Sequence, residues 1–265
     1  MKNAVKAIVL KDIRGITANR QLLIMILLVP FVLAVVLPSA FVLVMHFVPE
    51  EMEELGALLD MIPNLPGQGP DKLNLLNLMI NYLIPPLFFL IIPIMASTVM
   101  AASAFVGEKE KQTLETLLYS PLSLKEIFRA KVLAAFTLGM LVSALSFVAM
   151  FVAVGLLTRL LMGISLWPNL NWLATMLLVA PAFSLISITL IVRLSAKSKS
   201  VMEAQQAGGF MVLPLVALAA GQFAGVLILN FWMLLALGFL ALCLGLFLLN
   251  RAMNRFSYEK LLQQV

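Results

Sequence analysis

The chain has 265 residues, of which 62% are hydrophobic and 12% charged, and its mean hydropathy is +1.05. A soluble domain of this size is normally about a quarter charged, so the composition excludes an ordinary water-soluble fold and indicates a membrane protein. The net charge of +5 does not indicate a nucleic-acid partner, because the basic residues lie where they set membrane topology.

Residues 1–21 are predicted to form an amphipathic elbow helix in the membrane interface that leads into the first span. Lys11 and Arg14 fall opposite an apolar arc, although Asp12 interrupts that arc. The alternative is a plain basic topology anchor. The arc consists of Val5, Ile8, Val9, Ile13 and Ile16.

Long apolar stretches without charged residues predict an all-α integral membrane protein with six transmembrane helices. The stretch 204–250 would make a helix of roughly 70 Å, more than twice the hydrocarbon core, so it must fold back. We expect its turn at Gly221, Gln222, Gly225 and Asn230. The predicted spans are 22–47, 78–106, 132–157, 172–192, 205–223 and 231–249.

The distribution of basic residues predicts that both termini are cytoplasmic. Sixteen of the 18 Lys and Arg residues lie before span 1, between spans 2 and 3, between spans 4 and 5, or after span 6. Only Lys72 and Arg159 fall on the other side. By the positive-inside rule, the richer side is the cytoplasm.

Residues 48–77 are predicted to form an acidic extracytoplasmic loop. Their carboxylates could form a vestibule for cations, but without His, Cys or a calcium-loop spacing they specify no metal. A solvated helix followed by a Pro/Gly loop is the simpler interpretation. Trp167 and Trp172 lie on the same side and suit an aromatic belt.

The six spans contain no Asp, Glu, Lys or Arg, which disfavours an ion-coupled carrier or a voltage sensor. Prolines in the first two spans predict kinks that serve either a cavity and hinge or ordinary packing. We expect the remaining polar groups to hydrogen-bond between helices. They include Asn81, Ser97, Thr98, Ser143, Ser146, Ser184, Ser187, Thr189 and Gln206.

No catalytic signature is present. The sequence contains no GxSxG, HExxH or CxxC motif and no phosphate-binding GxxxxGK[ST] loop. Cys243 is the one cysteine, so no disulfide framework is expected. We therefore predict no catalytic residue, cofactor or metal site in this chain, and active transport would need energy from another chain.

Residues 107–131 carry nine charges between spans 2 and 3. A first short helix, with Leu114, Leu117 and Leu118 on one face, is predicted to end at Pro121. A capping box, Ser123 with the glutamate three residues later, opens a second helix into span 3. The leucine face suits either docking into a groove of a soluble partner or resting on lipid.

This segment, "VGEKEKQTLETLLYSPLSLKEIFRAKVL", resembles the coupling-helix region of ABC-2 type exporter permeases, with its G-E-K/R-E and T-L-E-x-L-L strings. Gln112 stands where the family often has Gly. "KDIRGITANRQLL" (11–23) is similar to the family's entry to span 1, and "NRFSYEKLL" (254–262) is similar to the ending of its sodium-efflux branch. The resemblance extends from end to end of the chain.

The resemblance implies a permease subunit that forms the translocation path with a second permease copy, as a homodimer, or with a related permease. A separate ATP-binding subunit would bind ATP and Mg and receive the coupling helix. The glutamates of the segment would make polar contacts with this ATPase, and its leucines would fill a groove. The residues implied in coupling are Gly107, Glu108, Glu110, Thr113, Leu114, Glu115, Leu117, Leu118 and Pro121.

The expected location is a prokaryotic plasma membrane, with the lipid bilayer as a further partner. The uncharged, kinked interior favours amphipathic or lipid-like cargo, whereas the branch resemblance implies sodium or small ions. Drugs and peptides remain open. The alternative from another class is a channel or membrane assembly factor outside the ABC family, in which residues 107–131 lie on the lipid surface.

Overall fold

The computed structural model describes residues 2–48, 76–77, 79–113, 122–165, 167–195, 197–223 and 230–255, and these residues contain helices but no strands. Within these ranges, six helices are long and apolar enough to cross a membrane, which confirms the predicted all-α class and the number of spans. The elements are α1 (Lys2–Ala18), α2 (Arg20–Phe31), η1 (Val32–Val36), α3 (Leu37–Phe47), η2 (Met79–Leu83), α6 (Ile84–Glu110), α8 (Leu124–Met162), α9 (Leu170–Ala174), η3 (Thr175–Val179), α10 (Ala180–Ser195), α11 (Val201–Gly209), α12 (Val212–Phe223) and α13 (Phe231–Arg255).

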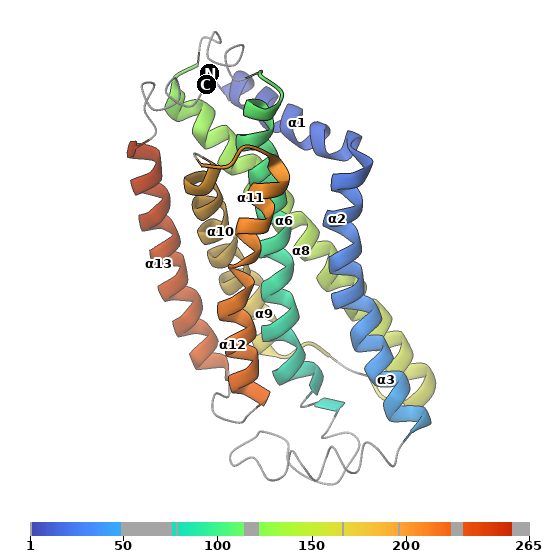
Figure 1. Ribbon diagram of the computed structural model, residues 1–265. Coiled ribbons are helices and arrows are strands. Elements are labelled where there is room, and N and C mark those ends of the chain that lie inside the picture. The colour runs from blue at the N-terminus through green and yellow to red at the C-terminus, as the bar shows by residue number, and fades with distance from the viewer. Residues whose placement is uncertain are drawn as a thin grey trace.

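Helix α6 is the centre of the bundle. Of its most apolar stretch 78% is buried, against 28% for α8 and 22% for α13. Helix α1 lies across one end of the bundle, and the last turns of α6 and α13 and the first turn of α8 lie at that same end (Figure 1). The helices that border the charged segment 107–131 therefore reach the same end as α1.

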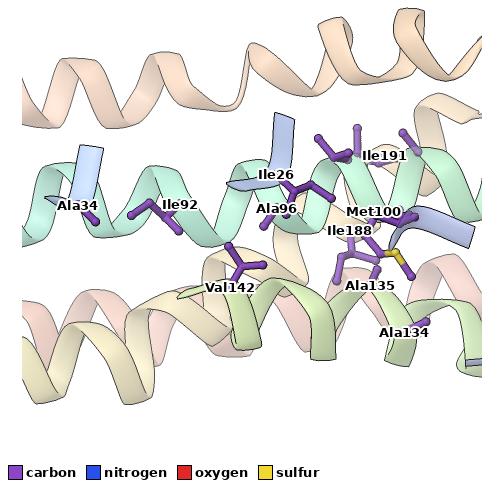
Figure 2. Close-up of a cluster of buried hydrophobic side chains, with 14 of the residues drawn as sticks. Ile26, Ala34, Ile92, Ala96, Met100, Ala134, Ala135, Val142, Ile188 and Ile191 are labelled. Carbon is purple, nitrogen blue, oxygen red and sulfur yellow. The ribbon is translucent and has the colours of Figure 1, made fainter. Parts of the chain in front are cut away.

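The core around α6 is built from alanines and branched aliphatic residues. Figure 2 shows Ile92, Ala96 and Met100 of α6 among residues of α8 and α10. Small side chains allow close approach of helix backbones, which is how helices gain contact energy where no water is displaced. Ala134 and Ala135 of α8 are completely buried in this cluster.

Prolines explain the π-helical turns η1 and η3. A proline cannot donate a hydrogen bond to the carbonyl four residues earlier, so that carbonyl needs another partner. For Pro38, the residue whose carbonyl loses its usual donor is Ala34, which lies inside η1. In the same turn, the Leu37 N–H donates to the carbonyl of Val32, five residues earlier, as in a π-helix. The same relation places Leu177, four residues before Pro181, inside η3.

The fifth predicted span, 205–223, has a matching candidate span at Val201–Leu218, but it is not one continuous helix. It consists of α11 and α12, separated by a turn at Phe210 and Met211. Pro214 accounts for the break, because its ring would clash with the Phe210 carbonyl in a continuous helix. The predicted turn residues Gly221 and Gln222 instead belong to the last turn of α12.

Two predictions about polar and aromatic side chains need correction. Trp172 is 1% exposed, so it belongs to the core and not to an aromatic belt, and its indole N–H donates to the side-chain oxygen Oδ1 of Asn81 at 3.1 Å. That bond confirms Asn81 as an interhelical contact. The hydroxyls of Ser146, Ser187 and Thr189 instead donate to carbonyls of their own helices, because a hydroxyl reaches the preceding turn more easily than a neighbouring helix.

Candidate functional site: a charged junction beside the coupling segment

The end of α6 is closed by a Schellman motif. The Thr113 N–H donates to the Glu108 carbonyl at 2.9 Å, and the Gln112 N–H donates to the Lys109 carbonyl at 3.1 Å. This motif requires a left-handed residue after the helix, and Gln112 has a φ of 55°. The geometry explains why a glycine would suit position 112.

The start of α8 carries the predicted capping box, which is confirmed. The Ser123 hydroxyl oxygen accepts from the Glu126 N–H at 3.4 Å, and Glu126 Oε2 accepts from the Ser123 N–H at 2.9 Å. Defined caps thus fix both helices that border residues 114–120 of the charged segment.

Glu108 lies between two lysines from other helices. Its Oε1 is 2.6 Å from Lys11 Nζ of α1, and its Oε2 is 2.7 Å from Lys131 Nζ of α8. The side chains of Glu108 and Lys131 are 9% and 3% exposed, whereas that of Lys11 is 56% exposed. A single carboxylate therefore joins three helices at the end of the bundle, and we name Lys11, Asp12, Glu108 and Lys131 the charged junction.

Lys131 is held at its buried position by further contacts. Its Nζ donates to the Ala104 carbonyl of α6 and lies 5.6 Å from the centre of the Phe105 ring. Phe105 and Phe128 pack edge to face with ring centres 5.7 Å apart. A charged amine in such surroundings needs its counter-charge, since the cost of removing it from water is otherwise unopposed.

Asp12 explains the interruption of the apolar arc of α1. Its side chain is 6% exposed and faces inward, with Oδ1 3.6 Å from Lys11 Nζ. Burial raises the pKa of Asp12, the positive charges of Lys131 and Lys11 oppose this rise, and the negative charge of Glu108 adds to it. Burial therefore favours the protonated form of Asp12 more than in water.

The pKa of Lys11 is also raised. Burial by itself lowers its pKa, but the hydrogen bond and charge of Glu108, together with Asp12, outweigh burial and raise the pKa above 10.5. A raised lysine pKa contributes stability at pH values below 10.5, and that contribution is lost only as the pH rises through the folded-state pKa. Lys11 consequently keeps its positive charge over the whole neutral range.

Glu110, two residues further along α6, connects to a different helix. Its Oε2 accepts the backbone N–H of Val201 at 2.9 Å, at the first residue of α11. The free N–H groups of a helix N-terminus favour a negative partner, so this contact stabilises the start of α11. The last turn of α6 therefore contacts α1, α8 and α11.

The family of the chain follows from a comparison with known protein families. A family model described as ABC-2 family transporter protein matches residues 6–239. The chain belongs to the ABC-2 transporter family. The comparison with curated proteins gives no match. Membership implies that the chain is a permease component of an ABC exporter. It is a multi-pass membrane protein. In this family, the membrane component has no ATPase site of its own. The match does not extend to the sodium-efflux branch, which stays a prediction.

The residues predicted to couple this ABC-2 permease to an ATPase fall into two groups. Gly107, Glu108, Glu110 and Thr113 are described and lie together at the end of α6. The others, Leu114, Glu115, Leu117, Leu118 and Pro121, lie outside the described residues, as does most of the acidic segment 48–77.

The structure shows what surrounds three of these predicted residues inside this chain. The carboxylate of Glu108 is occupied by lysines, and that of Glu110 by a helix N-terminus. Gly107 has a Val201 methyl 3.5 Å from the place of a Cβ, an ordinary contact, so nothing nearby requires a glycine. The polar contacts predicted with an ATPase stay a prediction for both glutamates.

Sequence analysis missed three members of the charged junction. Lys11 and Lys131 were interpreted as topology-setting charges, and Asp12 as an irregularity in an apolar arc. The signal that could have found them is Asp12 itself, because a carboxylate on an apolar face needs a cationic partner inside the fold. Among the described residues there is no group of three or more His, Cys, Asp or Glu side chains suited to a metal ion.

Proposed function

We propose that this chain is the permease subunit of an ABC-2 type exporter in a prokaryotic plasma membrane, with both termini in the cytoplasm. It forms the translocation path with a second copy or a related permease. A separate ATP-binding subunit, which holds ATP and Mg, drives it through residues 107–131. The family match over residues 6–239 is the observation that carries this proposal.

The arrangement at the end of α6 supports a mechanical role for the charged segment. The segment leaves α6 through the Schellman motif and enters α8 through the capping box, so a force on it acts directly on two membrane-spanning helices. Through Glu108, the same force reaches α1. A displacement of the segment thus moves three helices together rather than bending one loop.

The charged junction lies outside the stretches that we expect to line the export path. Glu108 and Lys131 lie at the end of the bundle, whereas predicted spans 2 and 3, at 78–106 and 132–157, contain no Asp, Glu, Lys or Arg. The charge pairs therefore belong to coupling, and the substrate meets an uncharged path. This favours amphipathic or lipid-like cargo over free ions.

The first test is purification of the tagged chain from native membranes in mild detergent, followed by mass spectrometry of the proteins that remain bound. We expect a soluble subunit with a phosphate-binding loop at near one-to-one stoichiometry. Repeated isolation of the folded chain without any ATPase would contradict the proposal and favour a channel or assembly factor.

The second test addresses the docking face. Replacing Leu114, Leu117 and Leu118 by Ser is expected to abolish ATPase binding and ATP-dependent export while the chain remains folded. Leu160→Ser is the matched control, because this exposed leucine lies on α8 outside residues 107–131. Unchanged binding and export in the triple variant would contradict docking through this face.

A further inference from the structure

A long apolar groove lies between α10, the α11–α12 pair and α13. Its volume is about 810 Å³, and the helices that form it lie side by side in Figure 1. Twelve of its thirteen lining residues carry no charge, and the thirteenth is Arg193. The lining includes Phe183, Leu190, Phe210, Pro214, Leu240 and Leu244.

The helix break between α11 and α12 forms part of this groove. Phe210 and Met211 occupy the turn that separates the two helices, and both line the groove. A continuous helix is prevented by Pro214, as described above. The groove therefore exists because the backbone changes direction between α11 and α12, and not only because the side chains there are small.

The length of the groove matches one leaflet of a bilayer. Along α10 its lining extends from Phe183 to Leu194, which is about 17 Å at the helical rise per residue. A hydrocarbon core is about 30 Å thick, so the groove corresponds to one acyl-chain layer. Arg193, in the last turn of α10, then lies at the level of lipid headgroups.

The charge at this end of the groove has no counter-ion within the described residues. Arg193 makes no ion pair there, and Glu203, the acidic residue of α11, accepts the backbone N–H of Lys199 at 2.7 Å. Lys197 and Lys199, both exposed, follow Arg193 in the connection to α11. Basic groups at the end of a groove between membrane helices favour anionic lipid headgroups.

A second apolar groove provides an internal comparison. It has a volume of about 460 Å³, lies between α2, η1 and α8, and its lining contains no charged residue. Ile24, Leu28, Leu145 and Ala149 are among its lining residues. A groove of this kind accepts acyl chains without a means of distinguishing headgroups.

We propose that the groove between α10, α11–α12 and α13 binds an anionic phospholipid of the bilayer, with an acyl chain along its apolar wall and the headgroup phosphate on Arg193. The guanidinium presents paired donors that match phosphate oxygens. The second groove binds acyl chains without preference for headgroup charge. This inference is independent of the proposed ATPase partner.

The test is native mass spectrometry of the purified full chain in neutral detergent, titrated with phosphatidylglycerol or with phosphatidylcholine of the same acyl chains. We expect at least one phosphatidylglycerol site with about tenfold higher affinity than any phosphatidylcholine site, which equals about 1.4 kcal/mol. Arg193→Gln removes this preference. The matched control is Arg251→Gln, which removes the same charge from exposed α13 outside the groove and leaves the preference intact.

Groove-filling variants test the position of the acyl chain. Ala241→Leu fills the proposed groove and is expected to reduce phosphatidylglycerol binding, whereas Ala149→Leu fills the second groove and leaves the charge preference unchanged. Size-exclusion chromatography and helical circular dichroism establish that each variant is folded. Equal affinity of the wild-type chain for both lipids, or a preference that survives Arg193→Gln, overturns the proposal. A photo-crosslink from position 240 to a second copy of the chain instead of lipid also overturns it.

Discussion

Helix α6 is fixed at two places by different interactions. At its end, Glu108 contacts two lysines from α1 and α8. In its middle, Ser97 and Thr98 lie against glycines: a Cβ on Gly139 would be 2.0 Å from Ser97 Oγ, and one on Gly208 would be 2.4 Å from Thr98 Cγ2. The end of α6 is therefore held by ion pairs, and its middle is held by close contact with glycines that have no side chain.

The comparison shows how a membrane helix can be held firmly yet still receive a signal. Close backbone contact between small residues is short-ranged and does not respond to protons or ions. A buried ion pair responds to both, and removal of one partner leaves the other as an uncompensated buried charge. We therefore expect the largest single-residue effects at the charged end, with smaller effects in the middle and at the helix caps.

Glu108→Gln is expected to have the largest effect. It leaves the buried amine of Lys131 without its counter-charge, and breaking such a pair costs about 3–5 kcal/mol. The loss is measured as the free energy of unfolding in detergent with increasing SDS, followed by tryptophan fluorescence. Because Lys131 is the uncompensated group, the double variant Glu108→Gln with Lys131→Met should recover most of the loss. A double variant no more stable than Glu108→Gln alone would refute the ion-pair explanation.

Gly139→Leu tests the middle of α6. The added side chain cannot fit beside Ser97, whose Cβ and backbone N would be 3.2 and 3.3 Å from the new Cβ. Overpacking of this kind costs about 1–3 kcal/mol. Gly155→Leu is the matched control on the same helix, because nothing lies within 4 Å of the place of its Cβ. Similar destabilisation by both variants in the same unfolding assay would contradict the close-contact model.

Gln112→Gly tests the cap of α6. A left-handed conformation costs a non-glycine residue about 1–2 kcal/mol, so glycine at this position should raise stability by about 1 kcal/mol. Gln112→Ala removes the same side chain but keeps the cost and should change stability little. The result would count against the capping argument if the two variants gave the same melting temperature.

Asp12→Asn is expected to have the smallest effect and to depend on pH. A carboxyl whose folded pKa lies above its ordinary 3.8 is most favourable to folding below that pH, and the contribution is lost as the pH rises through the folded value. The variant should therefore be more stable than the wild type at pH 7, and the difference should shrink as the pH falls towards 3.8. Melting temperatures measured across this range provide the check. A variant that is less stable at pH 7 would contradict the assignment.

The sequence predicted those features of the site that depend on residues close together in the chain. The capping box at Ser123 follows from a serine and a glutamate three residues apart, and Gln112 occupies the position where a glycine would fit. The environment of Glu108 could not be predicted, because its partners lie 97 and 23 positions away in sequence and on different helices. No sequence spacing shows which of several lysines will meet a given carboxylate.

The sequence by itself determined the membrane class, the six spans and the charged segment between the second and third spans. These properties depend on hydrophobic length and composition, which act along the chain without reference to its partners. Only the tertiary structure decided that α6 is central and that Asp12 and Lys131 face the interior. These features depend on which helix faces meet, because burial and ion pairing are properties of neighbours in space and not in sequence.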